Sequence, residues 1–246
     1  MQLCVLRGLL FFMAISDNVA IIRERIATAA RKAGRSPDSV ALMAVTKTHP
    51  PELVREAYGA GLRLFGENRV QEFSGKAGAL VELSEAKWHM IGHLQTNKAT
   101  KAVELFAAVD SVDSVNLAEK LNSAAQKVGK KLPVLIEVNV GGEEAKSGVA
   151  TDSQELEQLL TAPARLDALA FRGLMTVPPL TDDPEGARPF FRILRELRDR
   201  IASRNFSGIT MDVLSMGMSH DFEVAIEEGS TCVRVGTAIF GERTKA

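Results

Sequence analysis

The chain has 246 residues, of which 46% are hydrophobic and 25% are charged, and its mean hydropathy is close to zero, which is typical of a soluble globular protein with a large core. Thirty Lys and Arg residues nearly balance 31 Asp and Glu residues, so the net charge of −1 provides no global field that would favour nucleic acid or a membrane surface. The two cysteines, Cys4 and Cys232, lie far apart, which argues against a disulfide framework and indicates a reducing, cytoplasmic location.

The first fifteen residues are strongly apolar, but they do not form a convincing signal peptide or membrane anchor. Arg7 interrupts the apolar run instead of preceding it, no small-residue cleavage site follows, and the stretch is too short to span a bilayer. We therefore assign residues 1–15 to an N-terminal extension that is disordered or results from a wrongly assigned start, with Met13 as the alternative first residue. Residues 16–246 are assigned to one domain. Ser16 is predicted to be the N-cap of an amphipathic helix that reaches Gly34.

Beyond this helix, short apolar runs alternate with segments of helical periodicity. The apolar run at 133–140 is nearly continuous, which fits a parallel strand covered on both faces better than a hairpin. Strands are predicted at 41–46, 62–66, 87–92, 106–110, 133–140, 169–175, 209–215 and 232–236. Helices are predicted at 50–60, 69–83, 97–104, 115–129, 152–162, 184–204 and 220–228.

Two architectures fit repeated strand and helix units of this length: an open doubly wound sheet and a closed eight-stranded barrel. Eight strands in roughly 200 residues favour the barrel. The Gly-rich dinucleotide fingerprint that would support the open sheet does not occur in the sequence. The predicted fold class is therefore α/β, a single-domain (β/α)8 TIM-like barrel with an extra N-terminal helix.

In such a barrel the chemistry lies at the C-terminal ends of the strands. Polar residues occur at all of these ends, which predicts a small-molecule site, although polar residues also begin many loops simply because loops are solvated. The strand-end residues are Lys47, Glu67, Asn68, His89, His93, Asp110, Ser111, Asp113, Asn139, Thr176, Ser215, Gly236 and Thr237.

Lys47 follows directly on the apolar run that begins at Ala41, and its position has two interpretations. It is either a loop cation beside the helix start at Pro50, or a desolvated nucleophile that forms a Schiff base with an aldehyde or keto group. Pyridoxal phosphate proteins and class I aldolases use lysine in the second way. Local context alone favours the loop cation.

The segments that follow the last two strands resemble a phosphate site. Ser215-Met-Gly-Met-Ser219 offers two hydroxyls and a glycine, while Gly236 and Thr237 precede a short apolar helix. The alternative is an ordinary Gly-Thr turn that caps a helix. Arg234 shares the face of Gly236, and near a pyridine nitrogen its guanidinium would keep that ring unprotonated and restrain carbanion chemistry. The alternative partner for Arg234 is a strand-end carboxylate.

Six ordered motifs carry a resemblance to a known family. The chain from about Asp17 to Arg243 resembles the pyridoxal phosphate homeostasis protein family, also described as YggS-like or PROSC-like. The motifs are Ala44-Val-Thr-Lys47-Thr, Phe65-Gly-Glu-Asn-Arg-Val-Gln-Glu72, Trp88-His-Met-Ile-Gly-His-Leu-Gln-Thr-Asn-Lys98, Arg172-Gly-Leu-Met175, Leu214-Ser-Met-Gly-Met-Ser219 and Val233-Arg-Val-Gly-Thr-Ala-Ile-Phe-Gly241.

The resemblance implies a barrel domain, residues 16–246, that binds pyridoxal 5'-phosphate and is similar to the barrel domain of bacterial alanine racemases. It implies that Lys47 is the Schiff-base lysine, with phosphate contacts near the last strands and an arginine beside the cofactor. Two departures from the family are the apolar N-terminus and His220, where relatives often carry Asp. The implied cofactor-binding residues are Lys47, Asn68, Ser215, Met216, Gly217, Arg234, Gly236 and Thr237.

The function implied by the resemblance is intracellular cofactor homeostasis, that is, binding, buffering and delivery of pyridoxal 5'-phosphate through Lys47, with transient contacts to apo-enzymes and a monomeric or weakly dimeric state. No catalytic residue is assigned, because racemisation needs an acid or base on each face of the substrate carbon. Alanine racemases supply a tyrosine from a second domain, whereas the only tyrosine here, Tyr58, falls in an outer helix.

Three alternatives stay open. The first is a racemase-like enzyme or Schiff-base lyase that acts on small amino or keto acids with the same cofactor. The second is a class I aldolase-like enzyme with Asp110 or Asp113 as the acid. The third is a metal hydrolase that uses His89 and His93, for which no third ligand is found, so no metal is assigned. We expect both histidines, together with Trp88, to shape the pocket wall.

Overall fold

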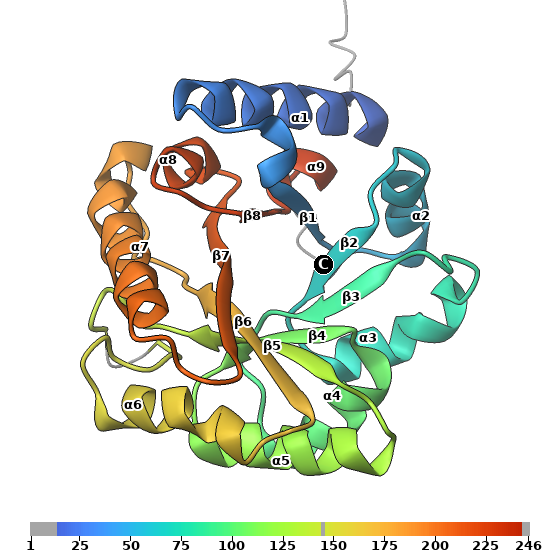
Figure 1. The fold of residues 1–246 in the computed structure, drawn as a ribbon. Helices are drawn as coiled ribbons and strands as arrows, with labels where there is room; N and C mark the ends of the chain where they lie inside the picture. The colour runs from blue at the N-terminus through green and yellow to red at the C-terminus, as the bar shows by residue number, and fades with distance from the viewer. Residues whose placement is uncertain (1–13, 144–145, 243–246) are drawn as a thin grey trace, which may run out of the picture.

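The structure is a computed structural model, and it describes residues 14–143 and 146–242. Its strands are all parallel and pair in chain order, and β8 closes on β1 to complete a barrel (Figure 1). The predicted TIM-like barrel is therefore confirmed. The strands are β1 (Ala41–Val45), β2 (Leu64–Glu67), β3 (Lys87–Met90), β4 (Ala108–Val112), β5 (Leu132–Glu137), β6 (Leu169–Met175), β7 (Ile209–Met218) and β8 (Cys232–Val235).

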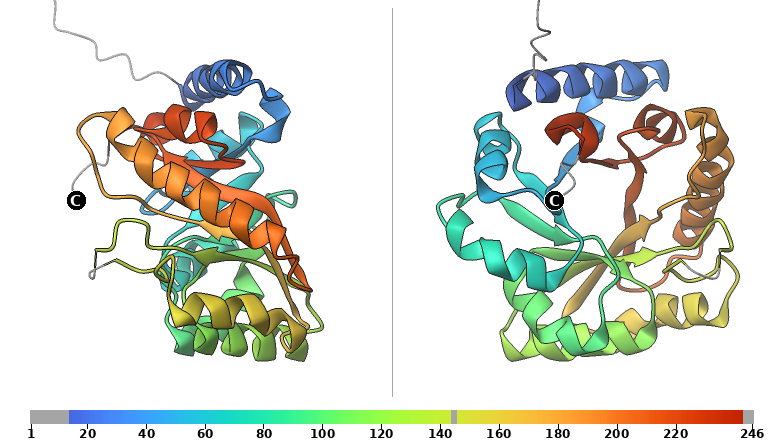
Figure 2. Two further views of the ribbon diagram at one scale, coloured as in Figure 1. Left: turned by 60° about the vertical axis from the view of Figure 1, so that its left-hand side comes forward. Right: turned by 180° about the vertical axis from the view of Figure 1, so that it is seen from behind.

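Helices surround the barrel, and the N-terminal helix completes their ring. Figures 1 and 2 show α1 lying across the side of the barrel between α8 and α2, and it packs on both of these helices and on α9. The extra helix therefore covers the strand side that the four-residue α9 is too short to cover. The helices are α1 (Ile15–Lys32), α2 (Pro51–Gly59), α3 (Val70–Ala77), α4 (Ala99–Leu105), α5 (Val115–Lys127), α6 (Gln154–Thr161), α7 (Arg188–Ser203), α8 (Phe222–Glu227) and α9 (Thr237–Phe240).

Several predicted boundaries differ from the structure, and two of these differences concern the start of α1 and the end of β7. Helix α1 begins at Ile15 with Ala14 as its N-cap, so the prediction that Ser16 is the N-cap was wrong. Strand β7 runs to Met218, three residues beyond the predicted end, and this difference moves the site residues that follow it. The predicted extension, residues 1–15, lies outside the described part of the chain except for Ala14 and Ile15.

The barrel carries one apolar core outside its wall and a smaller one inside it. The outer core lies between strands and helices, while the inner cluster consists of Met43, Val45, Ile91 and Cys232. Side chains alternate across a strand, so residues that follow an inward-facing residue at a spacing of two also face inward. This alternation directs Lys47 after β1, and Arg234 on β8, toward the barrel interior. Among the described residues, no helix is both long enough and apolar enough to cross a membrane.

Candidate functional site

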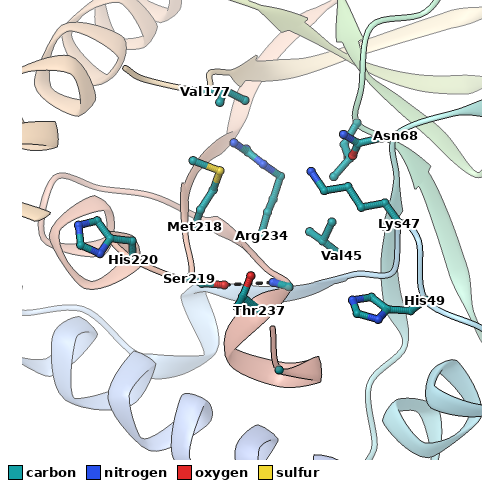
Figure 3. Close-up of a pocket in the computed structure, with 13 residues that line it drawn as sticks. Val45, Lys47, His49, Asn68, Val177, Met218, Ser219, His220, Arg234 and Thr237 are labelled. Atoms are coloured by element: carbon teal, nitrogen blue, oxygen red, sulfur yellow. Dashed lines mark hydrogen bonds between the residues drawn. The ribbon is translucent and has the colours of Figure 1, made fainter. Parts of the chain in front are cut away.

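A cavity of about 330 Å³ opens at the C-terminal ends of the strands (Figure 3). This size lies at the lower end of the roughly 300–1,000 Å³ that is usual for small-molecule sites. The cavity is bordered by residues that lie at or just beyond the ends of β1, β2, β3, β6, β7 and β8. Its lining residues are Val45, Lys47, His49, Asn68, Ile91, Val177, Met218, Ser219, His220, Arg234, Gly236, Thr237 and Gly241.

Lys47 lies two residues beyond the end of β1 and extends its side chain into this cavity (Figure 3). The residue is half-buried, and its neighbour Thr46 is fully buried. Thr48 has a φ of 65°, in the left-handed region that a β-branched residue rarely adopts. Such a conformation costs about 1–3 kcal/mol and persists only where the surrounding structure enforces it. The backbone around Lys47 is therefore held in a defined shape.

The turn between β8 and α9 presents polar groups to the opposite side of the cavity. The amide N–H groups of Gly236 and Ala238 donate to the hydroxyl oxygen of Ser219, at 3.2 and 3.3 Å. Thr237 lines the cavity beside them (Figure 3). The two amides and the hydroxyls of Ser219 and Thr237 form a donor set that suits a phosphate group.

Arg234 forms part of the cavity wall and is almost completely buried, with 4% of its surface exposed. Its Nη1 donates to the carbonyl and the hydroxyl of Ser215 at 2.8 and 2.7 Å, and its Nη2 donates to the carbonyl of Thr176 at 2.6 Å. Burial lowers the pKa of Arg234, an effect that nearby acidic groups oppose. A guanidinium nevertheless stays charged in proteins, so a fixed positive group lies at the cavity.

Glu137 at the end of β5 contributes a buried carboxyl to this region. The residue is 7% exposed, and its Oε2 has no hydrogen-bond partner. Burial raises the pKa of Glu137 to about 7; the charge of Asp113 also raises this pKa, whereas Arg234 lowers it. At neutral pH a large fraction of the Glu137 carboxyl therefore carries a proton.

The structure brings together five of the eight predicted cofactor residues. Lys47, Asn68, Arg234, Gly236 and Thr237 all line the cavity, from three separate parts of the chain. The other three, Ser215, Met216 and Gly217, are not among its lining residues.

The reason lies in β7, which continues to Met218 and keeps these three residues inside the sheet. The Ser215 hydroxyl is bonded to Arg234, and Met216 is completely buried in the core outside the barrel wall. Gly217 has a φ of 93°, and a Cβ there would lie 2.5 Å from the Cβ of Ala225. A glycine is therefore required at 217 by the packing of α8 against β7.

Sequence reasoning missed eight of the lining residues. For Ser219 a signal was present, because it is the second hydroxyl of the predicted phosphate segment. The apolar lining residues gave no signal in the sequence, because the same residue types fill the interior of any barrel. The missed residues are Val45, His49, Ile91, Val177, Met218, Ser219, His220 and Gly241.

His89 on β3 and His93 beyond its end do not line the cavity, so the prediction that they shape its wall was wrong. His89 Nδ1 lies 3.0 Å from Asp110 and His93 Nδ1 lies 3.1 Å from Asp113, so each histidine is paired with one of the carboxylates considered as acids. Trp88 was predicted to shape the pocket wall, and this was wrong, because its ring stacks on Phe65 outside the barrel. Within the described ranges, no group of three side chains could hold a metal ion.

Tyr58 lies where the sequence placed it, on the outer helix α2. Its ring packs under the Arg63 guanidinium at 3.9 Å, and its hydroxyl is 3.5 Å from Glu85. These contacts hold Tyr58 on the outside of the molecule, away from Lys47 and the cavity.

Comparisons with known proteins agree with this fold. The family model described as the N-terminal domain of alanine racemase matches residues 18–244. The solved alanine racemase of Streptomyces coelicolor A3(2) has a TM-score of 0.70 at 19% identity, and the match covers 94% of this chain and 58% of the racemase. At that identity the likeness concerns the fold alone. The chain is thus a barrel of the alanine racemase N-terminal domain class.

More similar relatives identify the family within this class of barrels. The pyridoxal phosphate homeostasis protein of Aquifex aeolicus (strain VF5) is 47% identical over 231 residues, which cover 94% of this chain and 99% of that protein. The structure of PipY from Synechococcus elongatus PCC7942, solved with pyridoxal phosphate bound, has a TM-score of 0.81 at 36% identity and covers 92% of this chain and 100% of PipY. The chain belongs to the pyridoxal phosphate homeostasis protein family, which confirms the resemblance found in the sequence motifs.

Proposed function

We propose that this protein binds pyridoxal 5'-phosphate in the cavity at the C-terminal end of the barrel and takes part in intracellular homeostasis of that cofactor. Lys47 is the residue that holds the cofactor covalently and reversibly. The observation that carries the proposal is the position of Lys47 on one side of a single cavity and of the Ser219, Gly236 and Thr237 donors on another (Figure 3). The PipY structure, with the cofactor bound in a relative that aligns over its full length, supports this assignment.

The donor set of the cavity matches the chemistry of the cofactor. When bound, pyridoxal 5'-phosphate supplies an aldehyde that condenses with an amine, a phosphate, and a pyridine ring nitrogen. The amine of Lys47 suits the aldehyde, and the hydroxyls and amides at 219 and 236–238 suit the phosphate. Arg234, which is fixed by hydrogen bonds to Ser215 and Thr176, supplies a positive group suited to an unprotonated ring nitrogen.

The position of the single tyrosine of the sequence favours a carrier over a racemase-like enzyme. Met218 and Val177 supply apolar surface to the cavity between its polar groups (Figure 3). A second acid or base on the face opposite Lys47 is what racemisation would need, and Tyr58 is held on the outer surface by Arg63 and Glu85. We therefore assign binding, buffering and delivery to this chain, with transient contacts to apo-enzymes as clients.

Transfer to an apo-enzyme tests the delivery role. The loaded protein, freed of unbound cofactor by gel filtration, is mixed with an apo-aminotransferase, and recovery of aminotransferase activity is followed over time. We expect recovery proportional to the loaded protein, whereas protein reduced beforehand with borohydride should give none. Recovery only after denaturation of the loaded protein would contradict delivery.

Exchange of the α-hydrogen separates a carrier from an enzyme. The loaded protein is incubated in D2O with alanine, serine and glutamate, and the loss of the α-proton signal is followed by NMR. We expect exchange no faster than with free cofactor at the same concentration. Turnover of many equivalents for any of these amino acids would favour the racemase-like or lyase alternative.

A further inference from the structure

A buried ion pair lies directly behind the segment that carries Lys47. Lys76 on α3 is 8% exposed and its Nζ lies 2.7 Å from Oε1 of Glu67, a fully buried residue at the end of β2. A buried charge pair is costly to desolvate, so its retention calls for an explanation beyond stability. The cavity described above does not include either residue.

The ammonium of Lys76 holds the backbone on both sides of Lys47. Its Nζ donates to the carbonyl oxygen of Thr46 at 2.8 Å and to that of His49 at 3.4 Å. With Glu67 as the third acceptor, the three N–H donors of the ammonium each have a partner. One cation therefore joins the residue before Lys47 and the residue two positions after it.

Two carboxylates complete the attachment. Glu67 accepts a hydrogen bond from the hydroxyl of Thr46, and Glu72 on α3 accepts one from the amide of Thr48. Thr48 is one of the two non-glycine residues with positive φ among the described residues. Because a threonine does not adopt this conformation unaided, the bond from its amide to Glu72 and the bonds of Lys76 account for its persistence.

We propose that Glu67, Glu72 and Lys76 form a clamp that fixes the backbone of residues 46–49 and thereby directs the Lys47 amine into the cavity. The three residues are positioning residues, since none of them lines the cavity. The inference rests on the proposed function only in that Lys47 is taken to bind the cofactor. The clamp itself is a property of the protein without cofactor. It also gives a role to the motif at 65–72, which cofactor contacts alone leave largely unexplained.

The clamp is tested with the double variant Glu67→Gln/Lys76→Met, which removes both buried charges together and so leaves neither one unpaired. The matched control is Lys101→Met, the same substitution at a half-exposed lysine that is paired with Glu104 at 3.0 Å on α4. Retention of the fold is checked by circular dichroism. Hydrogen exchange of the peptide amides of residues 46–50 is then measured by mass spectrometry without cofactor.

We expect amide exchange in this peptide to be at least tenfold faster in the double variant and unchanged in the control. In the same proteins, the rate at which pyridoxal 5'-phosphate becomes fixed to Lys47, trapped with borohydride at timed intervals, should fall at least tenfold in the double variant and less than twofold in the control. A folded double variant whose exchange and trapping rates both stay within twofold of the wild type would overturn the clamp.

If the double variant does not fold, a second variant tests the clamp. Glu72→Ala removes the partly exposed acceptor of the Thr48 amide, which also lies 3.7 Å from Lys76, and leaves the buried pair of Glu67 and Lys76 in place. We expect exchange at residues 46–50 to rise about fivefold in this folded variant, and an unchanged exchange rate would overturn the clamp. Absence of any adduct on Lys47 in the wild type would instead refute the proposed function, and the exchange measurements would still judge the clamp.

Discussion

Arg234 and Ser215 are joined by two hydrogen bonds inside the barrel, from one guanidinium nitrogen to the carbonyl and to the hydroxyl of the serine. With the further bond to the carbonyl of Thr176, the guanidinium is held by two neighbouring segments, the residue after β6 and the middle part of β7. Ser215 was predicted from the sequence to contact the phosphate. In the structure its hydroxyl accepts a hydrogen bond from Arg234, so a second role, the orientation of the guanidinium, is open to test.

Substitution of Ser215 separates these two roles. Ser215→Ala should destabilise the protein by roughly 1.5–3 kcal/mol, because a hydrogen bond to a charged group is lost in a buried place. It should weaken binding of pyridoxal 5'-phosphate and of pyridoxal, which has no phosphate, by similar factors. The two dissociation constants are measured by absorbance titration. A tenfold change in their ratio would show that Ser215 does bind the phosphate.

Substitution of Ser219 is expected to affect the two ligands differently. Its hydroxyl lies at the Gly236 and Ala238 amides, so we expect Ser219→Ala to lose about 1 kcal/mol of binding to the phosphate form and little binding to pyridoxal. The preference for the phosphate form should thus fall about fivefold, as measured in the same titrations. An unchanged preference would place the phosphate elsewhere in the cavity.

Gly217 is expected to be required by the fold rather than by the cofactor. In Gly217→Ala the new Cβ would lie 2.5 Å from Ala225 Cβ and 2.9 Å from Phe222 Cα, at a φ of 93°. The free energy of unfolding, measured by urea denaturation, should fall by roughly 2–5 kcal/mol. The control Gly75→Ala, with open space around the new Cβ in helix α3, should stabilise by roughly 0.5–1 kcal/mol. Equal effects at the two positions would contradict this explanation.

The raised pKa of Glu137 predicts that the stability of the folded protein depends on pH. Its pKa is raised from the ordinary 4.5 to about 7 in the folded protein, so between these values the folded state holds a proton that the unfolded state has lost. Stability therefore falls as pH rises from about 4.5 to 7, by up to about 3 kcal/mol, and the penalty is complete above pH 7.

The variant Glu137→Gln removes this penalty. Thermal melts should show the variant to be more stable than the wild type at pH 8, with a difference that shrinks as the pH falls and vanishes near pH 4.5. A difference that is constant across this range, or that grows toward acid pH, would show that Glu137 titrates normally in the folded protein.

The sequence predicted the barrel because eight apolar runs alternate with helical segments, a pattern that depends on local periodicity alone. Lys47 and Arg234 could also be placed, since their strands carry an alternation that fixes which side chains face inward. The end of β7 could not be predicted, because Ser215, Met216 and Gly217 have the composition of a loop, and only pairing with β8 and the packing of α8 keep them in the sheet. Because β7 runs three residues further than predicted, Ser219 lines the cavity and Ser215 does not.

The clamp behind Lys47 could not be inferred from the sequence at all. Glu67, Glu72 and Lys76 have the composition of an ordinary solvated helix start, and nothing in their spacing indicates that Lys76 is buried. Its burial follows from the parallel pairing of β1 with β2, which brings α3 against the segment that follows β1. Contacts of this kind depend on the closed barrel and become visible only in three dimensions.

The central claim is that Lys47 holds the cofactor, and reductive trapping tests it most directly. The wild-type protein is incubated with pyridoxal 5'-phosphate, reduced with borohydride, digested and mapped by mass spectrometry, with Lys47→Arg as the control that keeps the charge. We predict the added cofactor mass on the peptide that contains Lys47 in the wild type, and no adduct at that position in the control. An adduct found only on other lysines, or none at all in the wild type, would contradict the assignment of Lys47.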